Sequence, residues 1–124
     1  MNITTRLNSI KALWESAFPS IPYSLQLAGQ NETVPNAVFE IGQIEQFGGT
    51  TTKKGWRLNA EIKANFASDT DAISNLDTIV STFNRAKSAN WYYMVVTNAS
   101  VTANYQGHGS LWQITVSLVV EWTT

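Results

Sequence analysis

The chain has 124 residues, a mass of 13.7 kDa, a net charge of −1 and no cysteine. This length predicts a single domain over residues 1–124, large enough to bury roughly two thirds of the surface that the unfolded chain exposes. The lack of cysteine excludes disulfides and thiolate metal sites. The absence of a basic excess argues against nucleic-acid binding through phosphate contacts.

Charged side chains make up only 14% of the residues, whereas about a quarter is usual for soluble domains. Hydrophobic residues stand at 44%, which is an ordinary value. A low charge with ordinary hydrophobicity indicates that part of the surface is covered by a partner, and another copy of the chain would suffice. A surface rich in serine, threonine and asparagine is the alternative interpretation.

A first amphipathic helix is predicted over residues 1–18. Its apolar residues recur at steps of three or four, with Leu13 and Ala17 widening the stripe: Ile3, Leu7, Ile10, Trp14 and Phe18. Pro19 and Pro22 end it. Charged residues interrupt this segment, so we do not expect a signal peptide, and no stretch approaches the 18 apolar residues of a membrane span.

Short strands with turns between them are predicted next. Tyr23–Leu27 alternates, residues 28–35 are turn-like, and Ala37–Ile41 alternates again. The alternation changes face at Gly42 before continuing through Ile44, which predicts a β-bulge at this glycine. The stretch Phe47–Gly55, FGGTTTKKG, is predicted to be a loop.

The clearest strand is Trp56–Phe66, in which apolar and polar residues alternate throughout. The polar run from Ser68 to Asp71 then predicts the start of a second helix, because it supplies a cap and negative charge at the positive end of the helix dipole. The buried stripe of this helix is expected to hold Ile73, Leu76, Ile79, Val80 and Phe83, with Arg85 and Lys87 in its last turn.

The remaining strands are predicted over Trp91–Thr97, continued from Val101 to Tyr105 after an interruption, and over Leu111–Thr123. Residues 106–110 form a turn between them. The fold class is therefore α+β: an antiparallel sheet of about four to five strands with two helices packed on one face, in the order helix, strands, helix, strands.

The last predicted strand is long for a domain of this size. Thirteen residues at roughly 3.3 Å each would reach about 43 Å, whereas a compact domain of this length has a diameter of about 35 Å. The strand is therefore either strongly curved, or its end joins the sheet of a neighbouring subunit. The two interpretations are equally open.

The residue types that catalysis and metal binding need are few. The only histidine, His108, lies between glycines in a predicted turn, and Ser110 is too close in sequence to form a triad with it. Asp69 and Asp71 lie two apart at a helix start, where capping explains them better than calcium binding. We expect no enzymatic activity, no catalytic residue, no metal site and no cofactor.

Other candidate sites also have ordinary structural interpretations. Glu40, Glu45 and Glu61 lie opposite apolar positions on strands and fit a solvated face. The glycines and lysines of residues 48–55 do not form a phosphate-binding loop, because Gly55 follows the lysines and no helix comes next. The run 91–93, Trp-Tyr-Tyr, could stack on bases, but without a basic groove we interpret it as core and interface packing.

With these sites set aside, we expect the chain to function through contacts between its surface and other protein chains. The threonine and lysine loop offers cations to an acidic partner surface, and aromatic anchors favour interfaces. Of the tryptophans on predicted buried faces, the one nearest the end of the sequence is expected to contact another subunit. The candidate protein-interface residues are Phe47, Thr51, Lys53, Lys54 and Trp122.

Several segments together resemble the tail terminator (tail completion) proteins of long-tailed bacteriophages, and the related head–tail connector and neck proteins. They are the helix ending in FPSIPY, the stretch VFEIGQIEQF, the strand WRLNAEIKANF, the helix DAISNLDTIVSTF and the closing SLWQITVSLVVEW. The resemblance covers nearly the whole chain. It lies in the pattern of elements and not in a signature motif.

The resemblance implies an α+β structural subunit that forms a hexameric ring in the tail or neck of a virion assembled in the host cytoplasm. Such a ring caps the tail tube, ends its polymerisation and joins it to the head connector. The implied partners are other copies of the chain, the tail tube protein and a head connector or neck protein, with DNA only as passing cargo and no membrane. The alternative is a small-ligand-binding or enzymatic α+β domain with a pocket in a cone-like sheet.

Overall fold

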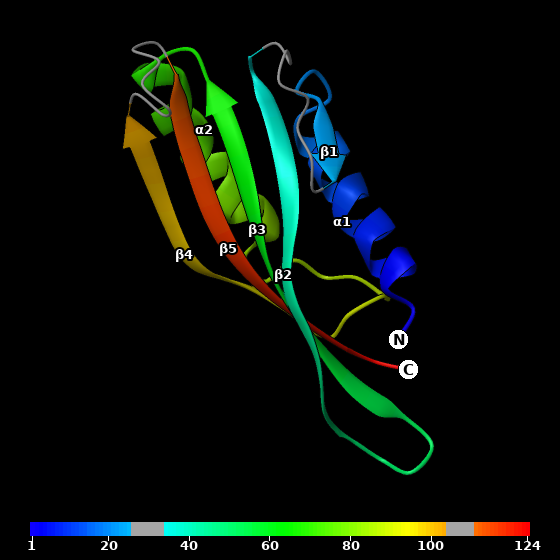
Figure 1. Ribbon diagram of the computed structural model, residues 1–124. Coiled ribbons are helices and arrows are strands. Elements are labelled where there is room, and N and C mark those ends of the chain that lie inside the picture. Colours follow the sequence, from blue (N-terminus) through cyan, green and yellow to red (C-terminus); the bar gives the residue numbers. More distant parts are fainter. Residues whose placement is uncertain (26–33, 104–110) are drawn as a thin grey trace.

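A computed structural model describes residues 1–25, 34–103 and 111–124. It is an α+β fold with two helices and one five-stranded sheet (Figure 1). The elements in chain order are α1 (Ile3–Ala17), β1 (Tyr23–Leu25), β2 (Asn36–Gly49), β3 (Lys54–Phe66), α2 (Asp69–Phe83), β4 (Tyr93–Ala103) and β5 (Trp112–Thr123).

The strand order is β1-β2-β3-β5-β4, so the two longest apolar strands, β3 and β5, lie at the centre. All pairs from β2 to β4 are antiparallel, but β1 pairs with β2 in parallel, through Ser24 opposite Val38. The sheet is therefore mixed, and the prediction of an antiparallel sheet is wrong at this edge. A helix precedes β1 and a connection of ten residues follows it, so no tight hairpin forces β1 to run antiparallel.

The core lies between the helices and one face of the sheet. Alternate residues of β3 and β5 point to that face, including Leu58, Ile62, Val116 and Val120, which are fully buried. From the helices, Trp14 packs against Phe83 with ring centroids 6.5 Å apart, and this contact joins α1 to α2 over the sheet. Both helices thus cover the same face, and the opposite face has no helix on it (Figure 1).

The ends of the helices follow from their sequences. In α2 the Ser68 hydroxyl accepts a hydrogen bond from the Asp71 backbone N–H at 3.1 Å, which is the expected N-cap. The helix ends at Phe83, so Arg85 and Lys87 lie beyond it and the prediction that they occupy its last turn is wrong. The predicted stripe is also wrong at Ile73, which is 60% exposed.

Register shifts interrupt the pairing on either side of the regular β3–β5 pair, and the pairing of β2 with β3 shifts once more between Gln46 and Gly49. The register of β2 against β3 shifts between Ile41 and Gln43, which confirms the bulge predicted at Gly42. A side chain at Gly42 would begin 2.9 Å from the Asn59 carbonyl oxygen, so the glycine is needed for close approach of the strands. The shift in β4, between Val96 and Asn98, explains the interruption seen in the sequence pattern.

The last strand finds its partners within its own chain. Strand β5 pairs with β3 over its whole length, from Trp112 opposite Phe66 to Thr123 opposite Gly55. The Thr124 and Lys54 backbones continue this ladder with two hydrogen bonds of 2.8 and 3.0 Å. The curved and twisted sheet visible in Figure 1 accommodates the length, so no neighbouring sheet is needed to pair this end.

Candidate interaction surface

The uncovered face of the sheet is polar but carries few charges. Its strands β2 to β5 contribute four glutamates and two cations, a net charge of −2. Neutral polar side chains fill much of the remainder. Asn65, for example, donates to Asn36 at 2.8 Å and accepts from Gln113 at 3.0 Å, which forms a hydrogen-bonded row across β2, β3 and β5. Asn36 and Gln113 are themselves buried, so the face is not open to solvent at this row.

Arg57 organises one end of this face. Its guanidinium donates to Glu121 at 2.8 Å and to Glu45 at 3.2 Å, so it bridges the two neighbouring strands. Its carbon Cζ lies 4.2 Å from the centroid of the Phe47 ring. The hydrogen bonds that Arg57 donates to Glu121 and then to Glu45 raise the pKa of Arg57 above its ordinary value. The cluster fixes the outer side of the sheet where β2 and β3 leave the body.

A second group of charges lies further along the same face. Glu40 and Glu61 are directly opposite each other on β2 and β3, an arrangement of like charges that is unfavourable by itself. Lys63 forms an ion pair with Glu40 at 3.0 Å. Among the residues that the structure describes, Glu61 has no hydrogen bond or ion pair. The group therefore holds two carboxylates beside one cation.

Beyond the body, β2 and β3 continue as a hairpin that we call the arm, Phe47–Gly55 (Figure 1). The predicted loop is shorter than expected, since β2 extends to Gly49 and β3 starts at Lys54. The turn is held by Thr50, whose hydroxyl accepts from the Lys53 backbone N–H at 3.0 Å and whose own N–H donates to the Lys53 carbonyl oxygen at 2.5 Å. The tip is thus an ordered turn.

The candidate interface residues of the arm lie where a partner could reach them. Thr51, Lys53 and Lys54 are exposed, and neither lysine forms an ion pair with any described residue. Phe47 is half-buried because one side of its ring is covered by Arg57. The structure brings these four residues together at one end of the molecule, and their role as an interface stays a prediction.

Trp122 is placed differently. Its side chain is 1% exposed, its indole N–H donates to the Met1 carbonyl oxygen at 2.8 Å, and the Arg6 guanidinium lies 5.3 Å from the ring centroid. The side chain is therefore used inside the subunit, between β5 and the start of α1. Trp122 offers no side-chain surface to a second subunit in this structure, and we leave it out of the proposed interface.

The other candidates from the sequence lie apart from this surface. Asp69 and Asp71 are in the first turn of α2, as the capping interpretation predicts. Trp91 is 5% exposed and donates to the Ala86 carbonyl oxygen at 2.8 Å, so it belongs to the core. His108 and Ser110 lie outside the described residues.

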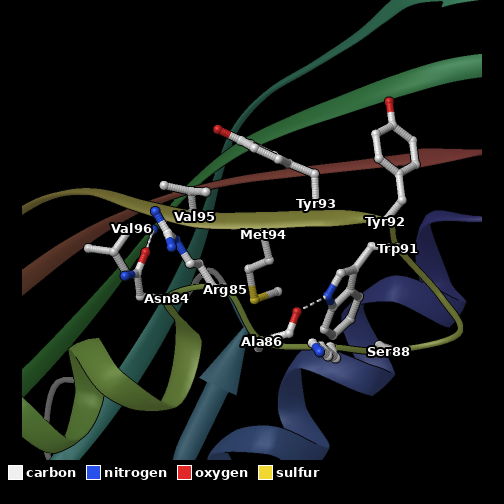
Figure 2. Close-up of a pocket in the computed structure, with 11 residues that line it drawn as sticks. Asn84, Arg85, Ala86, Ser88, Trp91, Tyr92, Tyr93, Met94, Val95 and Val96 are labelled. Atoms are coloured by element: carbon white, nitrogen blue, oxygen red, sulfur yellow. Dashed lines mark hydrogen bonds between the residues drawn. The ribbon is translucent and has the colours of Figure 1, made fainter.

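One feature was missed by the sequence analysis, a groove of about 970 Å³ between the segment 84–88 and the first half of β4 (Figure 2). Its strand wall includes Tyr92, which is 61% exposed, and Tyr93, which is 42% exposed, but both rings lie on the side of the strand away from segment 84–88 (Figure 2). Partial burial, with a smaller contribution from Glu121, raises the pKa of the Tyr92 hydroxyl. The local signal was the pair of tyrosines, but the strand pattern alone does not tell an exposed edge from a buried centre.

The wall of this groove is held by backbone contacts. The Arg85 N–H donates to the Met94 carbonyl oxygen at 2.8 Å, and the Asn84 side chain accepts from the Val96 N–H at 3.1 Å (Figure 2). Arg85 adopts a positive φ of 61° to make this turn. These contacts cover part of the free edge of β4 and bring Arg85 beside the groove.

No family model and no curated protein matches this chain. Within residues 1–25, 34–103 and 111–124, no group of three histidine, cysteine or carboxylate side chains is close enough to hold a metal ion. No helix in the same ranges has the length and hydrophobicity needed to cross a membrane. Function has to be argued from the surface features themselves.

Proposed function

We propose that this chain is a structural subunit of a phage tail or neck, which forms a ring of six copies that caps the tail tube and joins it to the head connector. The observation that supports this most is the arm. It extends an ordered, fully exposed and basic hairpin tip beyond the body of the domain. The exposed tip of this hairpin, residues 48–53, adds nothing to the core of its own subunit and suits contact with another chain.

The uncovered sheet face supports the same proposal. A single sheet with helices on one side leaves its other side without a helix, and here the strands β2 to β5 place neutral polar side chains and few charges on that side. Interfaces between subunits are typically depleted of charge at their centres. A contact between the arm of one subunit and the sheet face of the next would join two different surfaces of the chain. Repetition of such a contact closes into a ring when the rotation between copies allows it.

The mass of the protein in solution tests this proposal. Sedimentation velocity over a range of protein concentrations, with electron microscopy of the same samples, should reveal closed rings of one size. When the ring is mixed with polymerising tail tube protein, it should bind the end of each tube and stop the addition of further rows of tube protein. A protein that stays monomeric at every concentration, alone and with tail tube protein, would contradict the proposal.

The second candidate function is binding of a small ligand, and the groove between segment 84–88 and β4 favours it. Arg85, beside the apolar side chains of Trp91 and Met94, could hold an anionic, partly apolar molecule. The groove lies at the edge of the sheet and not on its apolar face, which is filled by core side chains. Thermal stabilisation by small aromatic carboxylates, lost in Arg85→Ala, would support this candidate over the ring.

A further inference from the structure

Glu61 lies in a depression of the uncovered sheet face. The depression measures about 250 Å³ and crosses all four long strands, from Gly42 on β2 through Asn59 and Glu61 on β3 and Ser117 on β5 to Thr97 on β4. Two β-bulges lie at its ends, at Gly42 and at Thr97. Each bulge bends its strand locally, which accounts for a hollow at this level of the sheet.

The charges in and beside this depression are unbalanced. Glu40 and Glu61 face each other across β2 and β3, and Lys63 pairs with Glu40. Glu61 is half-buried, and none of its described neighbours forms an ion pair with it. One more cation placed in the depression would balance the pair of glutamates and give Glu61 a hydrogen-bond donor.

The arm has the opposite imbalance. Between Phe47 and Gly55 there are two lysines and no acidic residue, and every residue from Gly48 to Lys54 is exposed. Within one subunit the arm points away from the body, so its lysines cannot fold back onto Glu61 (Figure 1). A cation from the arm can reach this depression only on another molecule.

We infer that the depression around Glu61 receives the Lys53/Lys54 tip of the arm of a second copy of this chain. This inference rests on the proposed ring and names its contact: the basic tip of each subunit docks on the acidic, uncovered face of the next. The two surfaces are different parts of the chain, so the contact is head-to-tail and leaves one free tip and one free face until the ring closes.

Charge reversal on each side of the contact tests the inference. Lys53→Glu/Lys54→Glu makes the tip acidic, and Glu61→Lys makes the depression basic. Each variant alone brings like charges together, so the dissociation constant for self-assembly should rise at least tenfold in sedimentation experiments. Because the changed residues lie on the surface, circular dichroism should show the same fold as for the wild type.

Mixing the two variants provides the sharper measurement. In an alternating ring every tip meets a face of opposite charge, so an equimolar mixture should assemble although neither variant does so alone. The triple variant Lys53→Glu/Lys54→Glu/Glu61→Lys should assemble by itself for the same reason. Matched reversals at other exposed positions, Lys11→Glu/Lys87→Glu and Glu15→Lys, should leave assembly unchanged.

The outcomes separate this contact from the ring proposal. If the wild type forms rings and both single-sided variants form them with unchanged affinity, the docking contact is wrong and the ring proposal stands. The same conclusion follows if each variant fails to assemble and the mixture fails as well. If the wild type never associates, the ring proposal and the contact are both wrong.

Discussion

At the scale of single residues, several polar side chains are held in unusual surroundings. The Tyr23 hydroxyl is buried without a hydrogen-bond partner among the described residues, and burial raises the pKa of this hydroxyl above its ordinary value. The Trp122 indole is buried as well, but it has a hydrogen bond to Met1. The two residues therefore predict opposite effects of substitution.

Tyr23→Phe removes a hydroxyl that gains nothing in the folded state. The variant should be as stable as the wild type at pH 7, or more stable by about 1 kcal/mol. Folding raises the pKa of Tyr23, so the contribution of its neutral form to stability is fully present below the unfolded pKa of about 10. As the pH rises above this value the unfolded chain loses this proton first, and that contribution is lost. Urea denaturation between pH 7 and 11 should show a shallower alkaline loss for Tyr23→Phe.

The control for this experiment is the exposed Tyr93. Tyr93→Phe should keep the alkaline loss of the wild type, because this side chain is 42% exposed and absent from the core. Equal slopes for the wild type and for Tyr23→Phe would show that the Tyr23 hydroxyl is solvated or hydrogen-bonded, contrary to our expectation.

Trp122→Ala tests whether this residue belongs to the core. The substitution should lower the free energy of unfolding by about 3–5 kcal/mol, as for other large buried aromatics. The measurement should be made at a protein concentration low enough to keep the chain monomeric. Tyr92→Ala, at a side chain that is mostly exposed, should change the value by less than about 0.5 kcal/mol. A small loss for Trp122→Ala under these conditions would favour an interface role.

At the scale of elements, the sequence predicted those whose local pattern is strong. Strand β3 alternates over its length, α1 has a continuous apolar stripe, and Gly42 marks a change of face, so all three were found. Strand β1 has only three residues, and its direction depends on where α1 packs, which no local pattern encodes. Ile73 was misplaced because spacing alone could not choose between it and its neighbour Ala72, which is fully buried.

The arm depends on a close backbone approach at Gly55. A side chain there would overlap the Phe47 carbonyl oxygen, whereas a side chain at Gly48 would meet nothing. Gly55→Ala should therefore distort the arm and destabilise the protein by about 1–3 kcal/mol. Hydrogen exchange of the arm amides, together with urea denaturation, measures both effects.

Gly48→Asn is the matched control, since asparagine tolerates the positive φ of 55° at this position. It should preserve both the exchange protection of the arm and the stability of the fold. If Gly55→Ala behaves like Gly48→Asn, the arm is not fixed by the contact between residues 47 and 55.

At the scale of the whole molecule, the candidate surface was only partly predictable. The exposed lysines of the arm follow from composition and turn residues, and Glu61 follows from strand alternation. The depression around Glu61 could not be predicted in this way, because it needs the bulges in β2 and β4 to lie at the same level of the sheet. That level is set by the pairing of strands far apart in the sequence. The groove beside β4 was missed for the same reason.

Association between copies predicts a stability that depends on concentration. If the ring forms, the Tm of the wild type should rise with protein concentration, because assembly favours the folded subunit by mass action. The Tm of Lys53→Glu/Lys54→Glu should stay constant over the same range. Scanning calorimetry at several concentrations provides the measurement, and equal behaviour of the two proteins would count against the arm as the contact.

The strand order has a consequence for the time course of folding. Apart from the edge strand β1, the sheet consists of two pairs that are neighbours in sequence, β2 with β3 and β4 with β5. They are joined by the β3–β5 pairing, whose partners are up to 68 residues apart. Local pairs close in microseconds, whereas distant ones close slowly because of the chain entropy lost in the loop. Until they join, β3 and β5 each expose an unpaired apolar edge, so a nascent chain is most prone to aggregate just before β5 docks.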